Sequence, residues 1–340
     1  MTSIMNPKVS VIVAIYNAEK TLRRCLDSLK SQHFQEIEFV LIDDGSTDSS
    51  LSICEQYQAE DSRFRVFHQE NKGVSRARQT GLFLSTGEFI IYLDSDDYAM
   101  PDAYQSLYLR AQETNSDIVY ADYLKCSSDV ILRETPVIHN CTTKLMLDDA
   151  IYHNRAFLWN HLIRKSIINE CEVAFPQKMD FGEDQFFIIS LLSGAIKDHR
   201  ELRIAHYNQP VICYDKTSNP HSLTSLDSHK RSESKYFWWK EIGGLISGVD
   251  SDKPYYSVLV VDAFYAFWNS ILTREEFMDH YGPYTKSIRK YAACGSRKFI
   301  VLLAAKGYYV FARRVRWICA PFILYERFHQ KKNRNSQRVK

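Results

Sequence analysis

The sequence lacks the features that mark a membrane-spanning protein, a zinc site or a nucleic-acid binder. No stretch holds the roughly 18–20 uninterrupted apolar residues that a spanning helix needs, and the nearest candidate, residues 299–325, is interrupted by one lysine and three arginines. None of the eight cysteines forms a CxxC pair or a Cys/His cluster with zinc spacing. The formal net charge is only +2, so no bulk positive field favours nucleic acid.

Other absences bear on compartment and organisation. The first residues carry no basic segment ahead of a long apolar core, so they predict a first strand and not a signal peptide. With the cysteine pattern, this predicts a reducing cytoplasm with free, mostly buried thiols. No internal repeat and no extended low-complexity tract occurs. The hydrophobic fraction of 45% and charged fraction of 25% are those of an ordinary globular protein.

Strand and helix signals alternate through the first third of the chain. Short runs of apolar and β-branched residues predict strands at residues 9–15, 38–42, 65–68, 88–93 and 116–123. Helical spacing of apolar residues predicts helices between them, the first with Asn17 as its N-cap. This order implies a mostly parallel sheet with helices on both faces. Because ligands bind at the carboxyl ends of such strands, the polar clusters that follow them should converge.

The later chain is divided by composition. Residues 216–231 are polar and turn-rich and predict a linker. Residues 232–329 predict an aromatic-rich helical region, and residues 330–340 predict a disordered tail. The segment 297–329 mixes basic and apolar side chains, which leaves two alternatives. It lies in a membrane interface, or it packs on the catalytic core or on a second subunit.

Three carboxylates, Asp94, Asp96 and Asp97, follow the strand expected at residues 88–93. Such a cluster is unfavourable unless a cation neutralises it. Oxygen ligands on one loop suit Mg²⁺ or Mn²⁺, and a diphosphate that bridges this cation is a natural leaving group. The alternative is a solvated acidic turn ahead of the next helix.

Two other groups suit a nucleotide. Asp43 and Asp44 end the second expected strand, where a carboxylate can accept a hydrogen bond from a uracil ring or a ribose hydroxyl. The alternative is an Asx-turn that starts the next helix. Arg76 and Arg78 lie on the helix expected at residues 74–85, and arginine suits phosphate and the edge of a base. Positions two apart on a helix diverge, so one of the two is expected on the surface.

Glu183 and Asp184 precede an apolar helical segment. From spacing alone, Asp184 reads as a helix N-cap and Glu183 as a favourable charge near the helix dipole. The alternative makes Asp184 a general base that takes a proton from an acceptor hydroxyl.

Four segments occur together in the order VSVIVAIYNAEKTLRRCLDSL, FVLIDDGSTDSS, ENKGVSRARQTGL and GEFIIYLDSDD. In this order they resemble the family 2 glycosyltransferases, which are inverting enzymes of the bacterial surface-polysaccharide type. The resemblance covers residues 8–125, is weaker at 157–168 and 181–187, and ends near residue 215. It implies the α/β GT-A fold, Rossmann-like with a mostly parallel central sheet and helices on both faces, followed here by the C-terminal helical region.

The resemblance also implies a reaction. A sugar moves by single displacement from a nucleotide-sugar, a UDP-sugar above all, to a hydroxyl of a glycan or lipid-linked saccharide. Residues 1–125 would form the nucleotide-sugar-binding half of the domain and residues 126–215 the acceptor-binding half. The implied enzyme is cytoplasmic, with or without peripheral contact to the cytoplasmic face of the membrane or to a second copy.

Site residues follow from the matched motifs. Mn²⁺ or Mg²⁺ is the implied cofactor, Asp184 matches the general base, and Glu183 orients it or touches the acceptor. The implied metal ligands are Asp96 and Asp94, and Trp159 and His161 would bind the acceptor. The implied donor pocket consists of Ala14, Tyr16, Asn17, Glu19, Asp43 or Asp44, Arg78, Asp94, Ser95 and Asp96.

This sequence departs from the family pattern in places. Residues 76–79 read Arg-Ala-Arg-Gln where Ala-Ala-Arg-Asn is usual, and His161 stands where lysine is common. No QxxRW motif occurs, which disfavours a processive synthase. A phosphatase with Asp94 as nucleophile is a rival, but its motif would follow the first strand. A non-catalytic nucleotide-sugar-binding partner subunit is another, and the intact Asp96 and Asp184 argue against it.

Overall fold

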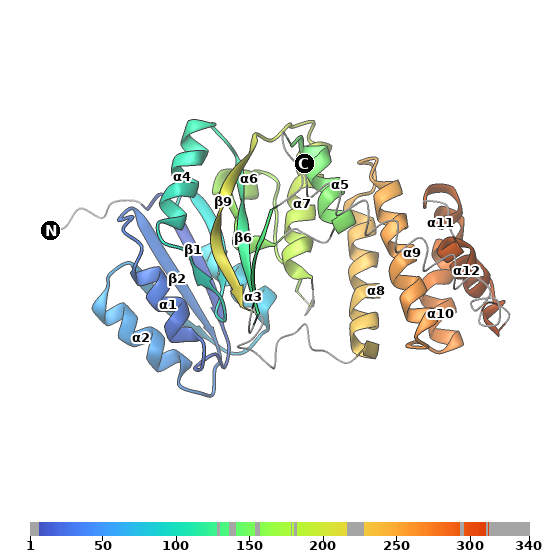
Figure 1. Ribbon diagram of the computed structural model, residues 1–340, viewed down its shortest axis with the longest axis horizontal. Helices are drawn as coiled ribbons and strands as arrows, with labels where there is room; N and C mark the ends of the chain where they lie inside the picture. The colour runs from blue at the N-terminus through green and yellow to red at the C-terminus, as the bar shows by residue number, and fades with distance from the viewer. Residues whose placement is uncertain are drawn as a thin grey trace. The chain divides into compact units, whose positions relative to one another are not determined.

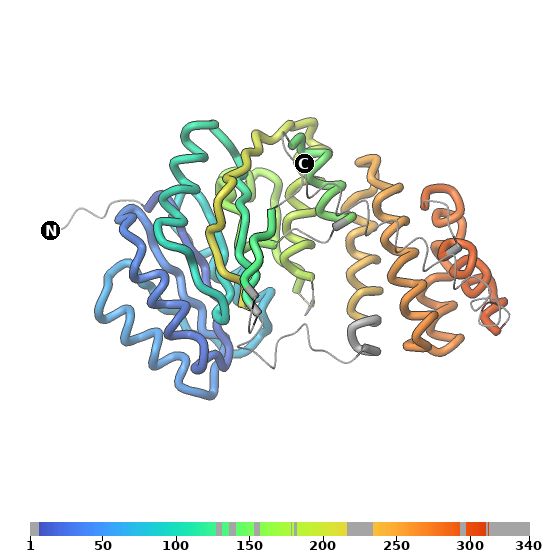
Figure 2. The backbone as a smooth tube through the Cα atoms, in the orientation of Figure 1, coloured from blue at the N-terminus to red at the C-terminus, as the bar shows by residue number. Residues whose placement is uncertain are grey.

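A computed structural model describes residues 7–127, 130–135, 141–153, 157–177, 179, 182–215, 228–292, 296–310 and 312 (Figures 1 and 2). The chain divides into two compact units, Met1–Ser225 and Leu226–Lys340. The division falls inside the linker expected at residues 216–231, although helix α8 already begins at Ser228. The tail expected at residues 330–340 lies outside the described residues.

A mixed sheet of nine strands, counted over the described residues, forms the centre of the first unit. Its order is β3-β2-β1-β4-β8-β6-β9-β5, and β7 pairs with β6. The strands are β1 Val9–Ile15, β2 Ile37–Asp44, β3 Phe64–Gln69, β4 Phe89–Asp94, β5 Tyr98–Ala99, β6 Ile118–Ser127, β7 Val130–Glu134, β8 His161–Arg164 and β9 Ile204–Asp215.

Parallel and antiparallel neighbours both occur in this sheet, and β5, β7 and β8 run against the strands they pair with. Strands β1 to β4 are parallel neighbours, as the sequence predicts. Beyond them β8 runs antiparallel to both β4 and β6, while β6 and β9 are parallel. Strand β6 crosses the expected boundary between the two halves at residues 125 and 126. The two halves therefore share one continuous sheet.

Helices cover both faces of the sheet, as predicted. Strand β1 shows why, because side chains alternate along a strand. Val11 and Val13 pack in a core with apolar side chains of α1, α2 and α4, whereas Ile12 lies against Gly81 of α3. The helical elements of this unit are α1 Leu22–Lys30, α2 Ser50–Glu60, α3 Val74–Leu84, α4 Ala103–Glu113, α5 Thr143–His153, η1 Leu158–Asn160, α6 Lys165–Glu170 and α7 Glu183–Lys197.

Helix α3 lies unusually close to the sheet at Gly81. A Cβ at this position would lie 2.3 Å from Cγ2 of Ile12 and 3.3 Å from Cγ1 of Ile42. Only glycine allows this approach without displacing the strand side chains. Because residues three apart share a helix face, Arg78 is also carried toward the sheet.

The prediction that Asn17 is the N-cap of α1 is wrong. The helix begins after Thr21, and Asn17 lies in a turn with φ of 48°. The side-chain oxygen of Asn17 accepts the backbone N–H of Thr47 at 2.8 Å. Asn17 therefore ties the loop after β1 to the loop after β2, an alternative that local sequence does not reveal.

The second unit is helical, as predicted. Its elements are α8 Ser228–Leu245, α9 Asp252–Trp268, α10 Arg274–Tyr281, η3 Gly282–Tyr284, α11 Thr285–Tyr291 and α12 Ser296–Ala305. Aromatic side chains fill its core, among them Trp239, Tyr255 and Phe267. Within the described part of the chain, no helix is long and apolar enough to cross a membrane.

The cysteines only partly fit the expectation of free, buried thiols. Cys25 and Cys54 are free and buried. Cys126 of β6 and Cys213 of β9, however, form a disulfide between neighbouring strands. Their separation of 87 residues explains why cysteine spacing gave no sign of the pair.

Candidate functional site

The carboxyl ends of three strands lie level at one edge of the sheet. Ala14 of β1 pairs in register with Ile42 of β2 on one side and with Asp94 of β4 on the other. Ile15 pairs with Asp43. The polar clusters after these strands therefore converge, as the sequence predicts.

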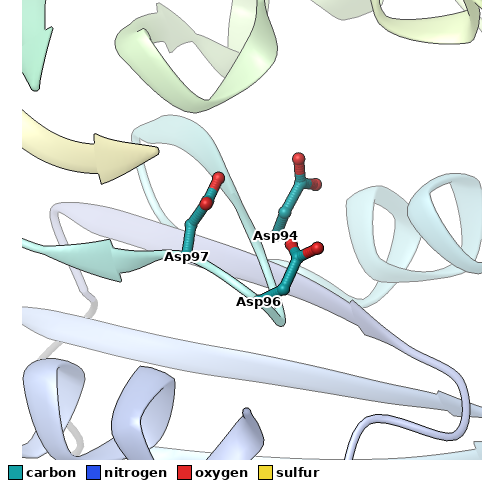
Figure 3. Close-up of side chains that lie close together, drawn as sticks. All are labelled: Asp94, Asp96 and Asp97. Carbon is teal, nitrogen blue, oxygen red and sulfur yellow. The ribbon is translucent and has the colours of Figure 1, made fainter. Parts of the chain in front are cut away.

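Three carboxylates gather just beyond β4. Ligand oxygens of Asp94, Asp96 and Asp97 all lie within 4.8 Å of one another. Figure 3 shows Asp94 and Asp96 side by side, with Asp97 set apart from them. Asp94 and Asp96 are partly exposed, whereas Asp97 is fully buried. Burial, followed by the charges of Asp94 and Asp96, raises the pKa of Asp97 well above its usual range.

Asp97 is anchored to the end of β9. Its Oδ1 accepts the backbone N–H of Asp215 at 2.8 Å, and its Oδ2 has no hydrogen-bond partner among the described residues. The two partly exposed carboxylates, Asp94 and Asp96, are thus the ones that can meet a ligand. Carboxylate oxygens at this spacing fit Mg²⁺ or Mn²⁺, whose remaining positions take water and phosphate oxygens.

Arg24 of α1 forms hydrogen bonds that hold the same loop. Its guanidinium donates to Oδ2 of Asp215 and, at 2.7 Å, to the backbone oxygen of Asp96. It also lies over the ring of Tyr98, 5.0 Å from the centroid. Sequence reasoning missed both Arg24 and Asp215, since 191 residues separate them and their contact arises only in the tertiary fold.

The structure distinguishes the two aspartates at the end of β2. Both carboxylate oxygens of Asp44 accept backbone N–H groups, from Lys72 at 3.0 Å and Gly73 at 2.9 Å. In Asp43, Oδ2 contacts the His68 ring at 2.7 Å and the backbone N–H of Ser46. Oδ1 of Asp43 has no partner among the described residues. Asp44 thus holds the loop after β3, whereas Asp43 is fully buried beneath it with one oxygen unpartnered.

The loop after β1 borders this edge. Tyr16, Asn17 and Glu19 are exposed there, and Ala14 and Ser95 are partly exposed. The carboxylate of Glu19 accepts the backbone N–H of Ser49 at 3.1 Å, in parallel with the bond from Thr47 to Asn17. These side chains order two neighbouring loops and leave the ring of Tyr16 at the surface.

A buried arginine joins the acidic loop to the start of α7. Arg78 donates through Nη2 to Oδ1 of Asp94 at 2.7 Å and through Nη1 to Oε1 of Glu183. Glu183 and Asp184 are the first two residues of α7, and the N-cap is Gly182 with φ of 80°. The N-cap interpretation of Asp184 is therefore wrong, because glycine takes the left-handed position that precedes the helix.

The carboxyl group of Asp184 has a raised pKa. Burial is the main cause, the charge of Glu183 adds to it, and Arg78 opposes both, so that the pKa of Asp184 rises to about 7. Burial and four nearby carboxylates also raise the pKa of Tyr214, and these carboxylates are Asp97, Asp94, Asp96 and Asp184. A carboxyl that titrates near neutral pH suits a general base.

The two residues expected to bind an acceptor are buried. Trp159 is 6% exposed and stacks between Phe157 at 4.8 Å and Tyr214 at 5.8 Å. His161 is 4% exposed, and burial lowers its pKa to about 4, so the ring is neutral. Packing accounts for both side chains, and their contact with an acceptor stays a prediction.

Known proteins are similar to this chain in sequence. The profile of Glycosyl transferase family 2 matches residues 10–170. EpsH of Bacillus subtilis (strain 168), provisionally named a glycosyltransferase, is 37% identical over 244 residues, which cover 68% of this chain and 65% of EpsH. EpsJ of the same strain, an uncharacterized glycosyltransferase, is 31% identical over 254 residues, which cover 70% of this chain and 72% of EpsJ.

A solved structure extends the likeness. The crystal structure of S. aureus TarS 1-349 in complex with UDP-GlcNAc has a TM-score of 0.73 and 20% identity, and the match covers 91% of each chain. The likeness confirms the predicted GT-A-like α/β fold and the helical region that follows it.

Proposed function

Since this chain belongs to Glycosyl transferase family 2, we propose that it transfers a sugar from a UDP-sugar to an acceptor hydroxyl. The UDP moiety is supported by the TarS complex with UDP-GlcNAc. The acceptor we propose is a glycan or lipid-linked saccharide in surface polysaccharide assembly. The observation that carries the proposal is the pairing of Asp94 and Glu183 through Arg78, which brings the acidic loop and Asp184 together.

On the donor side, the acidic loop binds the leaving group. Mg²⁺ or Mn²⁺ held by Asp94 and Asp96 would supply positive charge to the diphosphate as the glycosidic bond breaks. Asp97 keeps the loop in place through the N–H of Asp215, and Arg78 fixes the orientation of Asp94. The carboxylates can therefore hold one geometry while charge builds on the diphosphate.

On the acceptor side, Asp184 moves a proton. In its ionised form it accepts the proton of the acceptor hydroxyl while that oxygen forms a bond to the anomeric carbon. The bond from this carbon to the diphosphate breaks in the same step, and its electron pair leaves with UDP. No covalent intermediate is required, and the anomeric configuration inverts.

The second unit has exposed side chains that suit contact with a membrane, where a lipid-linked acceptor would lie. Phe299 and Tyr308 are 54% and 60% exposed, and Lys298 and Lys306 lie beside them in sequence. Apolar side chains next to lysines suit a membrane interface with anionic lipids. We propose peripheral contact with the cytoplasmic face of the membrane through these residues.

The variant Asp184→Asn tests the mechanism. We expect transfer to fall by about 100-fold or more, the scale of general-base catalysis. Affinity for UDP should stay within about twofold, because Asp184 does not touch the nucleotide in this mechanism. Asp198→Asn, at the exposed C-cap of the same helix, is the control and should keep full activity.

The alternative is a non-catalytic partner subunit that only binds a nucleotide-sugar. Hydrolysis of UDP-sugars without an acceptor discriminates between the two. A binding module shows no release of free sugar from any donor, whereas the enzyme releases it slowly, and Asp184→Asn reduces that release.

A further inference from the structure

Arg78 is a buried arginine that pairs with two carboxylates. Its side chain is 8% exposed, against 34% for Asp94 and 9% for Glu183. The close approach of α3 at Gly81 carries the guanidinium inward to the end of β4. Both of its terminal nitrogens donate to carboxylates.

The two carboxylates belong to different parts of the site. Asp94 ends β4 on the donor side, and Glu183 opens α7, the helix that carries Asp184. They lie 16 and 105 residues from Arg78 in sequence. No other residue described in the structure bridges these two carboxylates directly, so the guanidinium sets the spacing between the acidic loop and the first turn of α7.

The charges make this bridge hard to replace. Glu183 is buried, so removal of Arg78 would leave it without its ion-pair partner beside Asp184 and Asp94. Removing one partner of a buried pair is strongly unfavourable. An ammonium group would keep the charge, but it lacks the planar fork that reaches two carboxylates at once.

We propose that Arg78 is a positioning residue that holds Asp94 and the base-bearing end of α7 in one arrangement, and that it is not a ligand of the nucleotide. The proposal rests on the proposed sugar transfer with Asp184 as base. Arg78 acts through the groups it orients, so its loss should impair the transfer step more than the binding of UDP.

The variants are Arg78→Met, which removes the charge, and Arg78→Lys, which keeps it. Arg76→Met, on the exposed face of the same helix, is the control. Turnover should fall by about 100-fold in Arg78→Met, as expected for reacting groups displaced by an ångström, and by a smaller factor in Arg78→Lys. UDP affinity without metal should stay within about twofold in every variant.

Two measurements separate positioning from mere support of the fold. In the Asp184→Asn background, Arg78→Met should lower turnover by a smaller factor than in the unmutated chain, because the part of its effect that passes through the base is already lost. Hydrogen exchange should accelerate in peptides that cover residues 94–97 and 183–190, and not in those that cover α1. Neither change is expected for Arg76→Met.

Distinct outcomes would overturn each claim. Metal-free UDP binding weakened by about tenfold or more in Arg78→Met makes Arg78 a nucleotide ligand. An equal loss of turnover with and without Asp184 makes Arg78 a residue that only supports the fold. Unchanged exchange at either peptide means that Arg78 does not couple the two segments. Failure of the unmutated chain to bind UDP overturns the proposed function instead, and the exchange measurement still decides whether Arg78 couples the two segments.

Discussion

The rate of sugar transfer should fall steeply below neutral pH, because Asp184 must be ionised to accept a proton. Burial and the charge of Glu183 raise its pKa from an ordinary 3.8 to about 7. Such a carboxyl is ionised to about one half at pH 7, one tenth at pH 6 and one hundredth at pH 5. The ratio kcat/KM should therefore drop about tenfold per pH unit, whereas an ordinary aspartate would keep it level down to about pH 5.

A neighbouring substitution should move this profile in a defined direction. In Glu183→Gln the charge that raises the pKa of Asp184 is gone, and Arg78 has one carboxylate fewer to neutralise it. Both effects lower the pKa of Asp184. The acid side of the profile should shift to lower pH, and Glu170→Gln on α6 should leave it in place.

The assay is the initial rate of transfer at constant ionic strength from about pH 5 to pH 9, with donor and acceptor below saturation. A cation beside Asp94 also lowers the pKa of Asp184, so the profile is taken at the lowest cation concentration that supports turnover. A rate that stays level from pH 8 to pH 5 would refute the assignment of Asp184. A shift of the Glu183→Gln profile to higher pH would refute the charge argument.

The contribution of Asp184 to folding stability falls as pH rises, whereas its activity as a base increases. The folded-state pKa of Asp184 lies above its unfolded value, so its contribution to stability is fully present below about pH 4 and is lost as pH rises through about 7. Asp184→Asn should therefore have a higher Tm than the unmutated chain at pH 8, and the difference should narrow toward pH 5. An equal difference at both values would contradict the raised pKa.

Two further predictions concern the cation and the packing of α3. EDTA should abolish transfer and added Mn²⁺ or Mg²⁺ should restore it, and activity that survives complete chelation would remove the cation from the mechanism. Gly81→Ala should destabilise the fold by about 1–3 kcal/mol in chemical denaturation, because its Cβ would lie 2.3 Å from Ile12. Gly244→Ala, where nothing lies within 4 Å, is the control, and an equal effect of both changes would contradict the packing argument.

The sequence predicts the donor half of the fold well because its signals are local. Strands β1 to β4 are short apolar runs, each followed by a polar turn and a helical repeat. The carboxylates at their ends could be found for the same reason. The pairing of β6 with β9 could not, since Ile118 meets Ile204 only through the tertiary fold.

The errors at single residues share one cause. Asn17 and Asp184 have the chemistry of caps, but a capping side chain can equally bond a neighbouring loop or face a ligand. The burial of Trp159 against Tyr214 is likewise a tertiary contact that the sequence does not show, and its contact with an acceptor stays a prediction. Arg24 and Asp215 carry no local signal, because each gains its role only from a partner far along the chain.

The bond between Asp97 and Asp215 has a consequence for the order of folding. A chain made from its N-terminus completes β1 to β4 and the acidic loop within its first 97 residues. The residue that holds Asp97 is made 118 residues later. Contacts so distant along the chain form slowly, since a long loop must close first. The acidic loop is therefore among the last parts of the first unit to mature, and a nascent chain shorter than β9 carries this loop without its anchor.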